Sequence, residues 1–211
     1  MNSDEKYLIY YNDNYYDSYI SQEYTYNSFW YPLCEADITE KAFICNRNDN
    51  ICELGNENEV EIRKFSDEEL NMFILYTDFW GDWLHCNTNY KMPEFTEDNI
   101  EEIVLKKDDE ICEWIDYYNS NSYFAFQEQN EINSILNGLN NMKNQKKSYD
   151  FNEVQNKFEV CVKFKHINAL YYIGMVAFVD NNVVFYNSHE KINSFYLLYD
   201  NNTENPFDIL K

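Results

Sequence analysis

The side chains best suited to nucleophilic or acid–base chemistry in this sequence are its six cysteines and three histidines. A cysteine and a histidine lie close along the chain in two places, as the neighbours His85 and Cys86 and as Cys161 with His166. Such a pair acts as nucleophile and base only when the two groups are within hydrogen-bond reach and a third group orients the base. Alternation along a strand puts Cys161 and His166 on opposite faces, so we predict structural roles and no catalytic residue.

The sequence contains no recognisable motif for binding a metal or a phosphate. No two cysteines have the CxxC spacing of a zinc site, and Asp49, Asn50 and Glu53 lack the ligand spacing and the glycine of a calcium loop. The chain has four glycines and no Walker A, GxGxxG, GxSxG or HExxH sequence. We therefore predict no metal, no cofactor and no enzymatic activity. Because the chain is long and not dense in cysteine, its thiols are predicted to be free and mostly buried.

Charge is the strongest compositional feature, with 38 acidic against 16 basic residues and a net charge of -22. Up to Met142 there are 30 acids and 8 bases, whereas from Lys143 onward there are 8 of each. A negative field of this size opposes direct contact with the phosphates of a nucleic acid and attracts a basic protein. The sequence thus predicts a basic protein partner and no direct nucleic-acid contact.

The expected location is the cytoplasm of the producing bacterium or of a phage-infected host. The first six residues lack the basic and apolar regions of a signal peptide. The longest uncharged apolar run, Ala169 to Val179, is far shorter than the ~18 residues that indicate a membrane span. We therefore expect no membrane association, and the oligomeric state is left open.

The acidic segment from Glu94 to Asp116 is the predicted partner-binding region, because it holds ten acids and two lysines. If the segment is helical, its carboxylates recur about every 3.5 Å, close to the ~3.4 Å spacing of phosphates along one DNA strand. A solvated acidic face is the alternative interpretation. With two nearby tryptophans as anchors, the residues predicted to bind the partner are Glu97, Asp98, Glu101, Glu102, Asp108, Asp109, Glu110, Glu113, Asp116, Trp80 and Trp83.

Two inhibitory functions fit these features. The first is a bacterial toxin immunity protein, a non-enzymatic inhibitor that neutralises a basic-surfaced protein. The second is a phage-encoded inhibitor of a host nucleic-acid-binding defence enzyme, of anti-CRISPR or anti-restriction type, whose acidic segment mimics a nucleic acid. An enzyme using the Cys and His residues and an assembly protein using the tyrosine-rich N-terminus, where nine of twenty tyrosines lie in the first 31 residues, are the other classes considered.

Hydrophobic periodicity indicates which elements would position these residues, and it is clearest from Phe158 to Asp200. Strands are predicted at 158–164, 170–179, 183–186 and 195–199, which form an antiparallel β-meander of about four strands. The second of them, apolar almost throughout, is typical of a central strand covered on both faces.

About three helices are predicted in the middle of the chain. Ser66 and Glu69 form a capping box, which starts a helix that buries Leu70, Phe73 and Ile74 and ends near Gly81. Thr96 caps a second helical segment that reaches Tyr118, either as one helix or as two with Asp108 capping the second. A third helix is expected from Gln127 to Met142.

Short strands are expected in the N-terminal region, at 6–11, 42–45, 51–54 and 59–63. The predicted fold is therefore α+β, a C-terminal meander packed with about three helices and with an irregular β-rich N-terminal region. We expect a single domain, 1–211, made of a β-rich part (1–65), an acidic helical part (66–142) and the meander (150–200).

Overall fold

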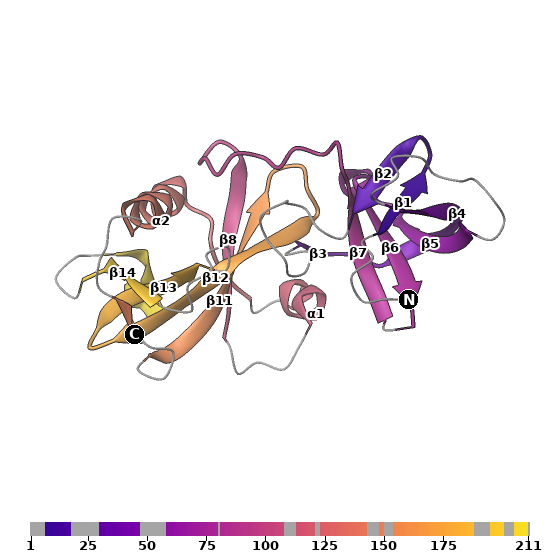
Figure 1. Ribbon diagram of the computed structural model, residues 1–211. Coiled ribbons are helices and arrows are strands. Elements are labelled where there is room, and N and C mark those ends of the chain that lie inside the picture. The colour runs from indigo at the N-terminus through magenta and orange to yellow at the C-terminus, as the bar shows by residue number, and fades with distance from the viewer. Residues whose placement is uncertain are drawn as a thin grey trace. The chain divides into compact units, whose positions relative to one another are not determined.

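The structure of the protein is a computed structural model. It describes residues 7–17, 30–46, 58–79, 81–107, 113–120, 123–142, 148–149, 154–187, 195–200 and 205–210. The chain forms two compact units, Met1–Met92 and Pro93–Lys211 (Figure 1). Both units are built mainly from antiparallel strands.

The N-terminal unit contains a closed β-barrel with the strand order β1-β2-β7-β6-β5-β4. The barrel strands are β1 (Tyr7–Tyr11), β2 (Asn14–Asp17), β4 (Ala36–Asn46), β5 (Glu59–Phe65), β6 (Phe73–Asp78) and β7 (Gly81–Asn87), and the short β3 (Trp30–Pro32) lies outside this ring. Alternate residues bury one face of the strands, as period-2 patterning requires. The resulting core holds Ile9, Tyr16, Ala42, Ile62 and Ile74.

The helix predicted to start at Ser66 is wrong. Only one turn of 3-10 helix forms, η2 (Glu68–Leu70), and the backbone then enters β6. Asp67, and not Ser66, caps this turn, because its Oδ1 accepts the amide of Glu69 at 2.9 Å. The β-branched and aromatic run that follows pairs with both β5 and β7. Those non-local partners decide the outcome, which a local capping signal does not contain.

The C-terminal unit is built on an antiparallel sheet with the order β10-β14-β13-β12-β11-β8-β9. Its strands are β8 (Ile100–Lys107), β9 (Phe124–Phe126), β10 (Ser148–Tyr149), β11 (Gln155–Phe164), β12 (Ala169–Val179), β13 (Asn182–Asn187) and β14 (Phe195–Tyr199). Strands β11 to β14 confirm the predicted meander. Each pairs with the next along the chain.

The helix predicted from Thr96 is also wrong, because residues 100–107 form β8 between β11 and β9. Ile103, Val104 and Leu105 are consecutive and all buried, so this strand is covered on both faces. Apolar residues at consecutive positions also fit a helical stripe, and periodicity alone does not separate the two over so short a run. Among the described residues of this segment, α1 (Trp114–Asn119) alone is helical.

The helix predicted from Gln127 to Met142 is confirmed as α2 (Gln129–Met142), which buries Ile132, Ile135 and Leu136. A short 3-10 helix, η3 (Pro206–Leu210), follows near the C-terminus. The α+β class with about three helices is therefore wrong: the described residues are mostly β, with two α-helices. No helix in these ranges is long and apolar enough to cross a membrane.

Candidate functional site

The tip of the β6–β7 hairpin exposes more aromatic surface than any other described part of the barrel unit. The Phe79 side chain is 93% exposed, and Trp83, on β7, is 38% exposed. Large aromatic side chains exposed in this way are the usual anchors of protein–protein contacts. Gly81 has φ +131°, which an L side chain rarely adopts, so a glycine is required where the chain enters β7.

Acidic side chains hold this tip in place. Asp78 Oδ1 accepts the Trp83 indole N–H at 2.9 Å. Asp82 accepts the Thr77 hydroxyl and the Arg63 guanidinium, each at 2.5 Å, and so connects β5, β6 and β7. These two donors hold the pKa of the Asp82 carboxyl below its ordinary value. The Trp83 side chain and the strands that carry the tip are thus pre-organised, which lowers the entropy cost of binding.

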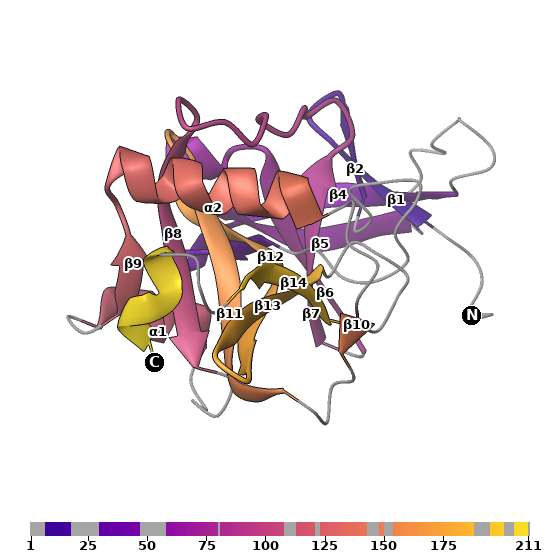
Figure 2. The ribbon, with the colours of Figure 1, turned by 90° about the vertical axis from the view of Figure 1, so that its left-hand side faces the viewer.

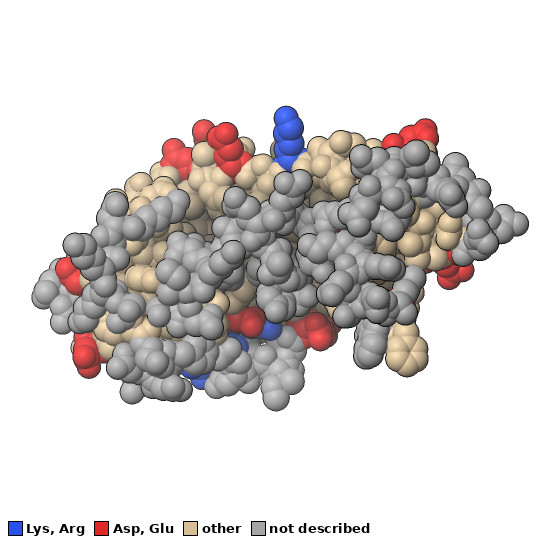
Figure 3. Space-filling model, in the orientation of Figure 1, with Lys and Arg blue, Asp and Glu red and all other residues tan. Residues whose placement is uncertain are grey.

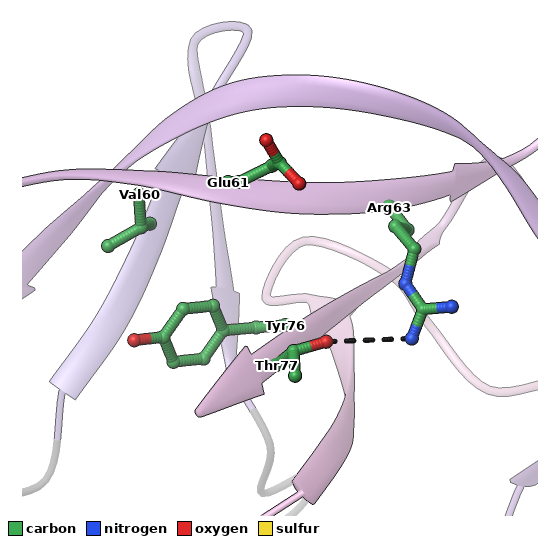
Figure 4. A pocket seen from close by; sticks show the side chains of 5 residues that line it. All are labelled: Val60, Glu61, Arg63, Tyr76 and Thr77. Atoms are coloured by element: carbon green, nitrogen blue, oxygen red, sulfur yellow. Dashed lines mark hydrogen bonds between the residues drawn. The ribbon is translucent and has the colours of Figure 1, made fainter. Parts of the chain in front are cut away.

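A shallow pocket of about 250 Å³ lies beside the hairpin, between β5 and β6. Figure 4 shows the Val60 and Tyr76 side chains near each other at one side and Arg63 reaching toward Thr77 at the other. The Arg63 guanidinium is already bound to Asp82, and Glu61 is exposed at the rim. The pocket is therefore a shallow depression suited to a side chain of a partner protein. The five residues that line it do not form an assembled set of catalytic groups.

His85 lies inside the barrel behind the hairpin, with its ring 6.1 Å from the rings of both Tyr7 and Tyr76. Its Nδ1–H donates to the Trp83 carbonyl at 3.0 Å, because a carbonyl can only accept. Its Nε2 has no hydrogen-bond partner among the described residues. Burial lowers the pKa of this imidazole, so the neutral form is favoured. His85 is a core residue of the barrel.

The acids predicted to bind a partner in the C-terminal unit differ in exposure. Glu97, Asp98, Glu101, Glu113 and Asp116 are at least partly exposed, whereas Glu102 is only 2% exposed. Trp80, Asp108, Asp109 and Glu110 lie outside the described residues. The structure thus leaves five of the predicted acids accessible in this unit and removes one of them into the sheet.

Glu102 accepts hydrogen bonds from three side chains. They are the hydroxyl of Tyr118 on α1, the Tyr123 hydroxyl at 3.3 Å and Gln127 Nε2 at 2.8 Å. Burial and the bond to Glu102 raise the pKa of Tyr118 above its ordinary value. Because its carboxylate is buried and its lone pairs are used internally, Glu102 is a structural residue.

Further charged side chains of β8 pair with charged side chains of the neighbouring strand β11. The register places Glu102 opposite Lys163 and Lys106 opposite Glu159. Lys106 Nζ lies 3.2 Å from Glu159, and Lys163 Nζ lies 2.9 Å from the exposed Glu101. These pairs fix the register of β8 against β11. They also reduce the charge that the segment presents to a partner.

The phosphate-like spacing predicted for residues 94–116 depended on a helix, and β8 takes its place. In a strand, successive side chains alternate between faces, so the carboxylates do not follow one line. The acidic side chains that are visible on the face drawn in Figure 3 lie in several separate groups. The spacing argument for nucleic-acid mimicry is therefore lost.

The cysteines only partly follow the sequence-based expectation. Cys34, Cys86 and Cys161 are free, but Cys45 is disulfide-bonded, which corrects the prediction of free thiols. Burial raises the pKa of Cys86 to about 12 and raises that of Cys161, so neither forms a reactive thiolate readily. Disulfides are rare in cytosolic proteins, so the cysteines do not support the cytoplasmic location, which stays a prediction.

No metal site is evident in the described ranges, where no three His, Cys, Asp or Glu side chains gather closely enough to hold an ion. His166, the predicted neighbour of Cys161, is exposed and has φ +62°. No family model, curated protein or solved structure matches the chain.

Sequence reasoning selected Trp83 but missed Phe79 and the Arg63–Thr77–Asp82 network. The run Asp78-Phe-Trp-Gly81 carried a usable signal, because a glycine in a short loop between two β-forming runs is typical of a hairpin. Reading that run as the end of a helix concealed the signal.

Proposed function

We propose that this chain is a non-enzymatic protein that binds and neutralises a basic-surfaced protein, with the β6–β7 hairpin as the apolar centre of the contact. The carrying observation is the 93% exposure of Phe79 at the tip of a hairpin fixed by its own acids. A net charge of -22 supports the choice of a basic partner, because it speeds the encounter of opposite charges.

A toxin encoded beside this chain is the form of partner that we propose, with this protein acting as its immunity protein. Two side chains define the expected geometry. Phe79 would enter an apolar pocket of the partner, and Trp83, held by Asp78, would cover the edge of that pocket. Water excluded by such an anchor strengthens the surrounding polar contacts.

The test measures binding between this protein and an inactive variant of the neighbouring gene product. If the proposal holds, the association rate falls by about tenfold or more between 50 and 500 mM NaCl, because salt screens the steering charges. Phe79→Ala then raises the dissociation rate by about tenfold.

The matched control is Ile209→Ala, which removes another exposed hydrophobic side chain, 71% exposed on η3 in the other unit. It is expected to leave both rates unchanged. Absence of binding, or binding that neither salt nor Phe79→Ala alters, overturns the proposal. Equal effects of the two alanine variants would show that the hairpin has no special role.

A further inference from the structure

A second cavity, of about 650 Å³, lies between α2 and β14 in the C-terminal unit. Figure 2 shows α2 running alongside β14, and the two elements are in contact. The helix contributes Asn130, Asn133, Asn137 and Asn141, and the strand side is formed by residues 197–200. The cavity is thus an open groove with one wall of side-chain amides and a floor that includes Leu197 and Leu198.

The four asparagines share one face of α2, because their spacings of three and four residues match the helical repeat. This face is distinct from the one that buries Ile132, Ile135 and Leu136. Asparagine is a poor helix former, so the stripe reduces the helix's intrinsic stability.

Gly138 and Tyr199, which both line the groove, fix the spacing between α2 and β14. The Tyr199 hydroxyl donates to the Ser134 carbonyl at 2.6 Å. A Cβ on Gly138 would lie 2.8 Å from that hydroxyl, so only glycine allows the tyrosine to reach the helix backbone. The bond joins helix to strand at this point, which leaves no room for a peptide strand to be inserted between them.

Asp200 is the single formally charged side chain among the described residues that line the groove, in a protein of net charge -22. An asparagine amide offers two donors and an acceptor without charge. A row of such amides matches closely spaced hydroxyl groups, each of which both donates and accepts. Leu197, which is partly exposed, supplies apolar contact for the C–H surface of a sugar ring, whereas Leu198 is buried against α2. The volume is within the range of small-ligand sites.

We propose that the groove between α2 and β14 binds a neutral oligosaccharide through the amides of Asn130, Asn133, Asn137 and Asn141. This binding is separate from the proposed capture of a basic protein. It requires neither the hairpin nor a protein partner, so the two proposals succeed or fail independently.

The experiment titrates maltose, cellobiose, lactose and chitobiose, one at a time, into the full-length protein. Nitrogen-15 NMR follows the side-chain NH₂ signals of the asparagines. At least one disaccharide is expected to shift the signals of Asn133 and Asn137 saturably. Asn137→Ala is expected to weaken that binding about tenfold, which corresponds to the loss of one or two hydrogen bonds.

Asn140→Ala is the matched control, because Asn140 is exposed on the same helix but does not line the groove. It should bind the sugar as the unaltered protein does. Both alanine variants favour helix, so retained circular dichroism separates lost binding from lost folding.

Three results overturn the proposal. One is that none of the four disaccharides shifts the amide signals, and another is that Asn137→Ala and Asn140→Ala weaken binding equally. The third comes from a neutral acetylated Thr-Val-Thr-Val-Thr peptide. If this peptide shifts the groove signals and the sugars do not, the groove is a peptide site.

Discussion

The barrel unit and the C-terminal unit carry nearly the same excess of acid and place it differently. Residues 1–92 contain 18 acids and 6 bases, a net charge of -12, and residues 93–211 contain 20 acids and 10 bases, a net charge of -10. In the C-terminal unit Glu102 is buried and Glu159 pairs with Lys106. On the hairpin of the barrel unit, Asp78 and Asp82 instead hold exposed side chains in place.

This difference shows that net charge does not reveal which carboxylates are accessible on the surface. A carboxylate that accepts several buried hydrogen bonds adds to the stability of the fold and is not available to a partner. A carboxylate that orients an exposed aromatic side chain contributes to recognition even though its own charge is partly used. The two units are therefore expected to respond differently to substitution.

The largest effect is expected at Glu102. Glu102→Ala should lower the free energy of unfolding by about 3 kcal/mol, because it leaves the donors of Tyr118, Tyr123 and Gln127 without their acceptor. Glu101→Ala is the adjacent control, since Glu101 is half exposed and pairs with Lys163, and should cost less than about 1 kcal/mol. Urea unfolding measures both. Equal losses would contradict the structural role of Glu102.

Gly138→Ala should lower the free energy of unfolding by about 2 kcal/mol, although this change ordinarily stabilises a helix. The reason is the Tyr199 hydroxyl, 2.8 Å from the position of the added Cβ. In a Tyr199→Leu background, which removes both the hydroxyl and the ring carbon Cζ that lies 2.9 Å from the added Cβ, the cost should shrink, and a double-mutant cycle measures this. A stabilising Gly138→Ala would show that the wall of the groove is not tightly packed.

A smaller effect is expected from pH in the barrel unit. His85 has a lowered pKa in the folded protein, so below its unfolded value of about 6.5 the unfolded chain binds a proton that the folded chain does not. Its contribution is constant above that pH. Stability should fall by about 1 kcal/mol from this residue between pH 6.5 and 5.5.

The measurement compares urea midpoints at pH 5.5 and 7.5 for the unaltered protein, His85→Leu and His166→Asn. His85→Leu should reduce the loss at low pH. His166→Asn should not, because His166 is exposed in the C-terminal unit. The same pH slope in all three proteins would exclude a buried neutral His85.

The smallest effect is expected from exposed acids of the C-terminal unit. If the proposed basic partner approaches this unit as well, the double change Glu97→Lys and Asp98→Lys should slow association about two- to fivefold at low salt. At about 0.5 M NaCl the difference should vanish, because exposed charges are then screened. An unchanged rate at low salt would confine the contact to the barrel unit.

Some elements could be predicted because their information is local. The meander combines period-2 alternation with turns at residues such as Asp180 and Asn181, both of which have positive φ. Helix α2 combines a buried stripe with adequate length. In both cases the predictive pattern lies within the element and the turns next to it, so it can be read without knowing contacts to distant parts of the chain.

Strands β6 and β8 could not be predicted in this way. Their apolar residues fit a helix and a buried strand equally well, and their partners β5, β7, β9 and β11 lie elsewhere in the sequence. The residues of the candidate site could likewise be predicted only in part. Trp83 was found from its type, whereas Phe79 became evident only when the hairpin was known.

The sequence by itself determined the excess of acid, the antiparallel meander and helix α2, because composition and short-range periodicity are properties of neighbouring residues. Tertiary structure decided that adjacent glutamates have different roles, with Glu101 exposed and Glu102 buried beneath Tyr118. It also decided that Phe79 is exposed, and that four asparagines of α2 face a groove. These outcomes depend on which strand or helix packs beside each residue, and that choice is made by contacts between distant parts of the chain.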